Sequence, residues 1–196
     1  IAQPATVLTW VILVLLFITS WGLHRLPEVT TGIRVVWVSV MVALWVMSGL
    51  LWFLLSDSAG GAHWDPFQSR LLVAGDVLLN APVLIPPAIG VSVLMLVGLF
   101  VAAKTASLRW FGVGWVIFAA LYVLCASVGN PFIRRWIVGA WYADPYRLAA
   151  MMPIVVVPLA AIGVMVIAAW VQRRAEASGT DRETLVNAAS LGVVLV

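Results

Sequence analysis

The stretch WYADPYRLAAMMPIVVVPLAAIGVMVIAAWVQ, residues 141–172, joins a short polar motif to a long apolar run. The run from Leu148 to Gln172 contains no charged residue, and it is longer than the roughly 20 residues that a helix needs to cross a bilayer. Residues 147–171 are therefore predicted to form a membrane-spanning helix. Asp144 stands at its expected N-cap and Pro145 at the favoured first position, so the carboxylate can accept hydrogen bonds from the free N–H groups of the first turn.

The polar motif in front of this helix allows two interpretations. In the first, Asp144 and Arg147 form a helix cap and an exposed salt bridge, which contributes about 0–1 kcal/mol. The aromatic residues Trp141, Tyr142 and Tyr146 are then part of an interfacial belt. In the second, Arg147 binds a phosphate and Asp144 orients the arginine. The motif alone leaves both interpretations open.

The composition of the whole chain is that of a membrane protein. Hydrophobic residues make up 64% of the 196 residues, charged residues make up 10%, and the mean hydropathy is +1.11. A soluble domain contains roughly 25% charged residues, and nothing in this composition indicates nucleic-acid binding. The one cysteine, Cys125, lies in an apolar run, so the sequence has neither a disulfide framework nor a cysteine metal cluster.

Five apolar stretches are predicted to span the membrane completely, and a sixth begins near the end of the chain. Their approximate ranges are 5–23, 35–55, 82–103, 110–128 and 147–171, with the sixth starting at 185. Residues 185–196 are too few to cross a hydrocarbon core that needs about 20, so we expect the chain to be a piece of a longer protein. The predicted fold is an all-α, polytopic transmembrane helical bundle.

Prolines and one amphipathic stretch add detail to this prediction. Pro86 and Pro87 are expected to break or bend the entry turn of the third span, and Pro153 and Pro158 are expected to bend the fifth, because proline supplies no N–H. Between the second and third spans, apolar residues recur at helical spacing among polar ones. That pattern predicts a short amphipathic helix at 64–80 that lies along the membrane interface.

The distribution of basic residues predicts an orientation in the membrane. The first, third and fifth connections hold seven lysines and arginines, whereas the second and fourth hold four. Connections rich in basic residues tend to stay in the cytoplasm. The two long connections, which contain most of the acidic and aromatic loop residues, are therefore expected outside, on the same side of the membrane.

The order of segments in the second half resembles a known family. The segments that carry the resemblance are LLNAP at 78–82, ALYVL at 120–124, and WYADPYRLAA at 141–150 followed by Pro153. Over residues 67–171 the chain resembles a family of large actinobacterial membrane proteins of unknown function. That family is similar to the GT-C glycosyltransferases, which take sugars from polyprenyl-phosphate carriers on the outer face. The resemblance implies a GT-C-like fold and a continuation into an extracytoplasmic domain.

The resemblance also implies a function, namely glycosyl transfer during cell-envelope assembly. Such a reaction needs a carboxylate to deprotonate the acceptor and a cation to stabilise the departing phosphate. Asp144 is the first candidate for the carboxylate, and Asp65 and Asp76 are weaker ones. The expected lipid-phosphate and sugar contacts are Arg147, Arg134, Arg135, Tyr142, Tyr146 and Trp141.

Other interpretations remain open. His63 and Asp65 suggest a divalent cation, which some GT-C enzymes use, but two residues do not make a metal site. A transporter or flippase of lipid-linked saccharides would suit the helices broken by proline, although the five predicted spans lack charged residues in their cores. A third interpretation is a non-catalytic subunit that binds membrane lipids and other envelope-assembly proteins.

Overall fold

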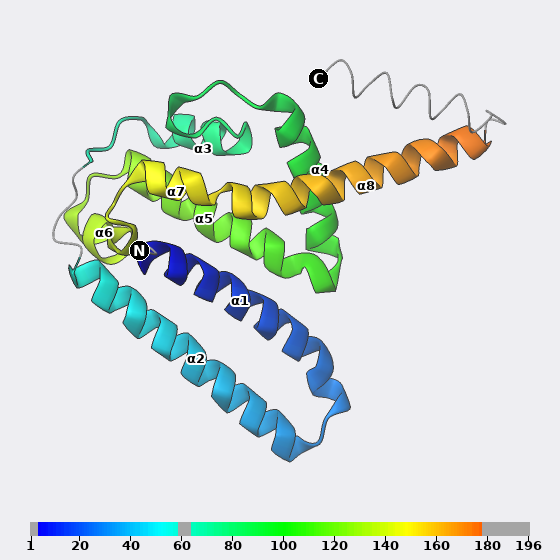
Figure 1. The fold of residues 1–196 in the computed structure, drawn as a ribbon, viewed down its shortest axis with the longest axis horizontal. Coiled ribbons are helices and arrows are strands. Elements are labelled where there is room, and N and C mark those ends of the chain that lie inside the picture. Colours follow the sequence, from blue (N-terminus) through cyan, green and yellow to red (C-terminus); the bar gives the residue numbers. More distant parts are fainter. Residues whose placement is uncertain (1–3, 59–63, 178–196) are drawn as a thin grey trace.

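The computed structural model describes residues 4–58 and 64–177 (Figure 1). Every regular element in these two ranges is a helix, so the predicted all-α fold is confirmed. The α-helices are α1 (Pro4–Arg25), α2 (Thr31–Ser58), α3 (Arg70–Leu78), α4 (Ile89–Lys104), α5 (Arg109–Ser127), α6 (Pro131–Trp136), α7 (Pro145–Met151) and α8 (Pro153–Ala177). Short 3-10 turns are η1 (Leu26–Glu28), η2 (Pro82–Leu84), η3 (Ala106–Leu108) and η4 (Gly139–Trp141).

Within residues 4–58 and 64–177, four helical stretches are long and apolar enough to cross a membrane. They are Ala5–Glu28, Thr31–Ser56, Ala106–Ser127 and Pro145–Ala177. These stretches fit the expected membrane protein and overlap the first, second, fourth and fifth predicted spans. The sixth span, predicted to start at 185, lies outside the described residues.

The predicted third span, 82–103, differs from the helix in the structure. Its counterpart α4 begins only at Ile89, and its 16 residues extend about 24 Å at 1.5 Å per residue. That length is short of a hydrocarbon core of about 30 Å. Three prolines precede the helix, and the backbone there forms η2 and an extended segment because proline interrupts the hydrogen bonds of a helix. Pro86 and Pro87, which were expected to break or bend the entry turn, lie before the first residue of α4.

The predicted fifth span is divided at Pro153, one of the two prolines expected to bend it. Pro153 has no N–H to donate to the carbonyl of Ala149, which instead accepts a bond of 3.1 Å from the N–H of Met152. α7 therefore ends at Met151, and α8 starts at Pro153. The second proline, Pro158, lies inside α8 without ending it.

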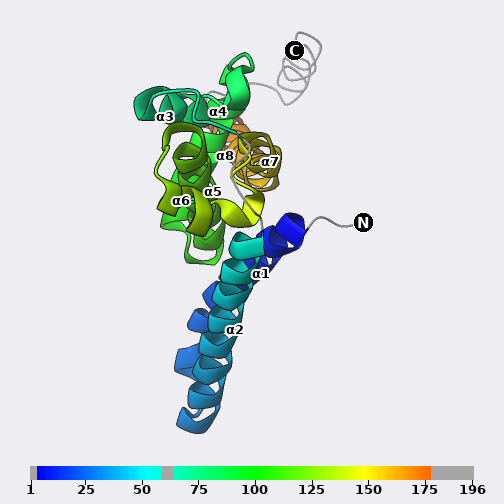
Figure 2. The same cartoon turned by 90° about the vertical axis from the view of Figure 1, so that its left-hand side faces the viewer.

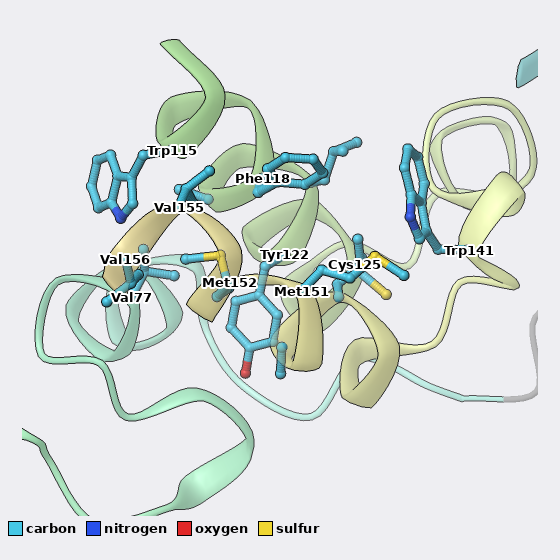
Figure 3. Close-up of a cluster of buried hydrophobic side chains, with 14 of the residues drawn as sticks. Val77, Trp115, Phe118, Tyr122, Cys125, Trp141, Met151, Met152, Val155 and Val156 are labelled. Carbon is cyan, nitrogen blue, oxygen red and sulfur yellow. The ribbon is translucent and has the colours of Figure 1, made fainter. Parts of the chain in front are cut away.

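α5 is the centre of the helical packing. It contacts α1, α3, α4, α7 and α8, while α1 and α2 form a hairpin that extends away from the other helices (Figures 1 and 2). The buried side chains of α5 include Phe118, Tyr122 and Cys125. Figure 3 shows them beside Met151 and Met152 from the α7–α8 junction. The core thus joins the first and last described spans through α5.

α4 and α8 cross at a contact between their backbones. A Cβ atom added to Gly98 of α4 would lie 1.8 Å from the carbonyl oxygen of Leu159, and one added to Gly163 of α8 would lie 2.0 Å from that of Leu94. Neither position has room for a side chain. Two glycines, one from each helix, therefore allow this close approach.

Candidate functional site

The two long connections meet at one end of the molecule, as the sequence predicts. The N–H of Phe67 in the first connection donates to the carbonyl of Ala126, where the second begins, over 3.0 Å. At the end of α2, the indole N–H of Trp52 donates to the carbonyl of Ile137 over 3.1 Å, and its ring packs edge-on against Trp141 at 4.9 Å. Side chains from both connections can therefore form one site.

Asp144 caps α7, which confirms the predicted cap position. Its Oδ1 atom accepts hydrogen bonds from the backbone N–H groups of Tyr146 and Arg147, at 2.9 and 3.4 Å. Its Oδ2 atom accepts a bond of 3.1 Å from Nε of Arg147, which makes the expected salt bridge. Both carboxylate oxygens are therefore engaged, and 15% of the Asp144 side chain is exposed.

Arg147 has the more open position of this pair, with 33% of its side chain exposed. Its guanidinium lies 4.4 Å from the centre of the Tyr142 ring, a cation–π contact. Tyr142 and Ala143 have φ values of 62° and 47°, so the chain reverses just before the cap. Among the described residues, the terminal Nη atoms of Arg147 have no hydrogen-bond partner. Arg147 is thus fixed by Asp144 and Tyr142 while its outer nitrogens can bind an anion.

An apolar cavity of about 440 Å³ lies next to this motif. Its walls come from the end of α3, the loop before α4, and the α7–α8 junction. They include Val77, Asn80, Val83, Tyr146, Ala150 and Val157. Tyr146 is 53% exposed and packs against Trp64 at 5.1 Å. The cavity therefore lies at this end of the molecule, with Tyr146 of the motif in its wall.

Arg134 is buried and binds only backbone carbonyls. It is 7% exposed, and its guanidinium donates to the carbonyls of Cys125 (3.0 Å), Val128 (3.3 Å) and Ala143 (3.3 Å), and to that of Trp64. The carbonyl of Cys125 belongs to α5, that of Trp64 to the first long connection, and those of Val128 and Ala143 to the second. Hydrogen bonds from the Arg134 guanidinium therefore link the two connections, and its N–H groups are not directed at a ligand.

The match to a protein family covers the whole chain. A model of a family of unknown function, DUF6541, matches residues 1–196. The chain belongs to DUF6541. No curated protein and no solved structure matches it. The expected likeness of this DUF6541 chain to GT-C glycosyltransferases stays a prediction.

Trp141 of the DUF6541 chain lies in the core, away from any ligand. It has no exposed surface, and its indole N–H donates to the Thr9 hydroxyl over 3.1 Å. Thr9, which is also fully buried, lies 2.8 Å from the sulfur of Met151. Trp141 therefore joins η4 to α1, and Thr9 joins α1 to α7. Thr9 was missed in the sequence, where a lone threonine in an apolar run gives no signal of its partners.

The other predicted site residues of the DUF6541 chain are spread around this end. Arg135 stacks on Trp136 at 4.7 Å, and Trp136 stacks on Phe53 at 4.6 Å. Asp65 is exposed and follows Trp64, which contacts Tyr146. Asp76 lies on α3, with one carboxylate oxygen buried and without a hydrogen-bond partner in the structure.

No hydrogen bond or ion pair within the described residues joins Asp65 or Asp76 to Asp144 or Arg147. His63 lies outside the described residues. The described residues contain no group of three or more metal-ligating side chains of the His, Cys, Asp and Glu types. The suggested divalent cation therefore has no ligand set in this part of the chain.

Proposed function

We propose that this protein binds a polyprenyl-phosphate-linked sugar at the extracytoplasmic face of the bacterial plasma membrane. In this proposal it is a GT-C-like glycosyltransferase of cell-envelope assembly, or the membrane part of one. The helices are its multi-pass transmembrane domain, and the end that holds the two long connections faces outward. We infer the reaction class from the resemblance over residues 67–171, and the binding site from the geometry around Arg147.

The observation that supports the proposal is the position of the Arg147 guanidinium. A guanidinium that keeps unpaired outer nitrogens suits a phosphate oxygen, because charge-assisted hydrogen bonds are short and strong. Asp144 uses Nε of Arg147, and Tyr142 covers one face of the group, so its orientation is fixed before a ligand binds. Tyr142 and Tyr146 then flank the phosphate and the sugar.

In the proposed transfer reaction, the carboxylates of Asp144 and Asp65 have different roles. The bond between the anomeric carbon and the phosphate oxygen breaks, and the acceptor oxygen bonds to that carbon. The acceptor proton passes to a carboxylate, and polyprenyl phosphate departs with the electron pair, stabilised by Arg147. Because both oxygens of Asp144 accept hydrogen bonds, we assign it a positioning role. Asp65, exposed beside the Trp64–Tyr146 contact, is the base in this proposal.

A flippase or transporter of lipid-linked saccharides is the second candidate, and the α7–α8 junction favours it. The helix is broken at Pro153 beside the apolar cavity, as the broken helices of transporters are beside their substrates. Ion-coupled transport is less well supported, because residues 148–171 and 110–127 contain no charged residue. A transfer assay with a radiolabelled lipid-linked sugar separates the candidates, since a flippase moves the lipid without forming product.

The binding proposal is tested with Arg147→Ala in the full chain, reconstituted in nanodiscs, and with farnesyl phosphate as the probe. Losing a hydrogen bond to a charged group costs about 1.5–3 kcal/mol, so the affinity should fall by about tenfold or more. Arg70→Ala, which removes an arginine from the start of α3 at the same end, is the matched control and should bind normally. Equal affinities for farnesyl phosphate in the Arg147→Ala variant and the unmodified chain would overturn the proposal.

A further inference from the structure

We infer that the loop between α3 and α4, residues 79–88, inserts its apolar side chains among the acyl chains of the leaflet nearest the two long connections. The partner of this loop is a lipid surface, and the contact extends the membrane contact predicted for the amphipathic stretch 64–80. It requires the chain to lie in a membrane, but it does not depend on phosphate binding at Arg147.

The loop presents aliphatic side chains outward. Leu84 is 70% exposed, and Ile85 and Ile89, the first residue of α4, are exposed as well. The loop lies at the edge of the molecule in both views (Figures 1 and 2). From Val77 to Ala103 the sequence contains no charged residue. An exposed aliphatic surface of this kind is typical of a contact with lipid or with another protein.

The backbone of the loop fixes these side chains in place. Val83 and Leu84 have φ values of 52° and 64°, a left-handed conformation that is uncommon for residues other than glycine. The N–H of Val83 donates to the Tyr122 hydroxyl over 2.6 Å, which ties the loop to α5. The N–H of Ala88 donates to the carbonyl of Leu79 over 3.0 Å, which closes the base of the loop. The loop is therefore a fixed feature of the surface.

The backbone donors of the loop are used almost entirely inside the protein. Residues 79–88 include three prolines, which have no N–H, and six of the other seven residues donate hydrogen bonds to partners within the described residues. Unpaired N–H groups are costly in hydrocarbon, so this pairing allows the loop to approach it. Carbonyl groups need donors as well, and at the membrane interface water and headgroups can supply them. The backbone should therefore lie at the interface while its side chains reach deeper.

The apolar surface continues along one face of α4, which identifies lipid as the partner. The exposed side chains of this face, at intervals of three or four residues, are Ile89, Val93, Leu96 and Phe100. The stripe ends beside Lys104, whose ammonium lies 4.1 Å from the centre of the Phe100 ring, as expected where a lipid-facing helix reaches the other interface. Because α4 alone is shorter than a hydrocarbon core of about 30 Å, the loop supplies the missing apolar length.

The contact with α5 indicates how deep the loop lies. Tyr122, which binds the N–H of Val83, lies five residues before Ser127, the last residue of α5. Five residues of helix extend about 7.5 Å. Interfacial helices bury their apolar faces about 5–10 Å into the boundary between headgroups and acyl chains. Leu84 should therefore reach the upper part of the acyl chains.

The experiment places a nitrobenzoxadiazole fluorophore on Leu84→Cys or on Ile89→Cys, in the full chain with Cys125→Ala, reconstituted in nanodiscs. Ser69→Cys is the matched control, because Ser69 is exposed just before α3 and its side chain caps no N–H. A nitroxide near the top of the lipid acyl chain should quench both test labels at least about twofold more than the control label, since groups buried 5–10 Å lie at that depth. Iodide in the water should quench the control label more.

Two results would overturn lipid insertion. If iodide quenches the labels at Leu84 and Ile89 as strongly as the control label, the loop lies in water. If neither quencher reaches them, another protein or a second copy of this chain covers the loop. Ile89 lies in regular helix, so Ile89→Cys decides the question if Leu84→Cys does not fold. The farnesyl phosphate assay with Arg147→Ala is separate, so either proposal can fail while the other stands.

Discussion

Arg134 and Arg147 belong to the same connection and are only thirteen positions apart in the sequence, yet the structure places them in opposite environments. Arg134 is enclosed by four carbonyls, whereas Arg147 keeps a third of its side chain exposed. A buried guanidinium is stable only when hydrogen bonds replace its lost hydration. The first arginine is therefore structural, and the second can bind a ligand.

Replacing Arg134 by lysine should destabilise the fold. Lysine has three donors on a single nitrogen and cannot match a planar fork that reaches four carbonyls. At least one buried carbonyl would lose its partner, and the expected loss is about 2–3 kcal/mol of unfolding free energy. Denaturant titration in detergent measures it. The control Arg135→Lys keeps a cation over Trp136 and should change stability by about 1 kcal/mol or less.

Asp144→Asn and Asp144→Ala separate capping from acid–base chemistry. Asparagine caps helices as well as aspartate does, so Asp144→Asn should cost little stability, while Asp144→Ala should cost about 0.5–2 kcal/mol. In a positioning role, Asp144→Asn keeps measurable transferase activity and binds farnesyl phosphate at least as tightly, because Arg147 loses its counter-charge. Complete loss of turnover with unchanged binding would instead identify Asp144 as the base.

Local features of the motif could be predicted, and its tertiary surroundings could not. The cap and salt bridge of Asp144 follow from spacings of two and three residues along one helix. Trp141 and Arg134 were expected to face a ligand because both occur in a polar connection. Their burial depends on Thr9 and Trp64, which lie more than sixty residues away in the sequence. Such partners become apparent only when the chain is folded.

At the scale of helices, the apolar runs predicted which membrane spans form, and proline determined where the third begins and where the fifth is divided. The stretches around α1, α2 and α5 contain no proline inside their helical runs after Pro4, and their predicted ranges overlap the helices found. The third predicted span was wrong at its start. Hydropathy continued through 82–88, but three prolines there prevented regular hydrogen bonding.

The crossing of α4 and α8 should fail when either contact glycine gains a side chain. Gly98→Ala or Gly163→Ala would bring a methyl group within 2.0 Å of a carbonyl oxygen, so the helices must separate. Overpacking of this kind typically costs about 1–3 kcal/mol. Gly90→Ala on α4 is the control, since a Cβ there meets nothing within 4 Å. If all three variants unfold at the same denaturant concentration, the crossing is not a close contact.

At the scale of the whole molecule, charge is unequal between the two ends. The turns after α1 and α4, together with the last part of α8 (Figure 1), contain six basic and two acidic residues, whereas the two long connections contain four of each. Three helices also end with an aromatic residue followed by a cation four positions later. These cation–π pairs are Trp21 with Arg25, Phe100 with Lys104, and Trp170 with Arg174.

Such pairs are suited to a membrane interface, because the ring lies at headgroup level while the cation faces anionic lipid and the negative end of the helix dipole. The end with the turns after α1 and α4 should therefore lie in the cytoplasm, and the end with the two long connections should lie outside.

The single cysteine makes this orientation testable, since Cys125→Ala gives a background without thiols. Phe132→Cys, at a residue 65% exposed in the second long connection, should react with a membrane-impermeant maleimide on intact cells. Glu28→Cys, at an exposed side chain in the first turn, should react only after permeabilisation. The opposite pattern would place Arg147 in the cytoplasm, where a lipid carrier presented on the outer face could not reach it.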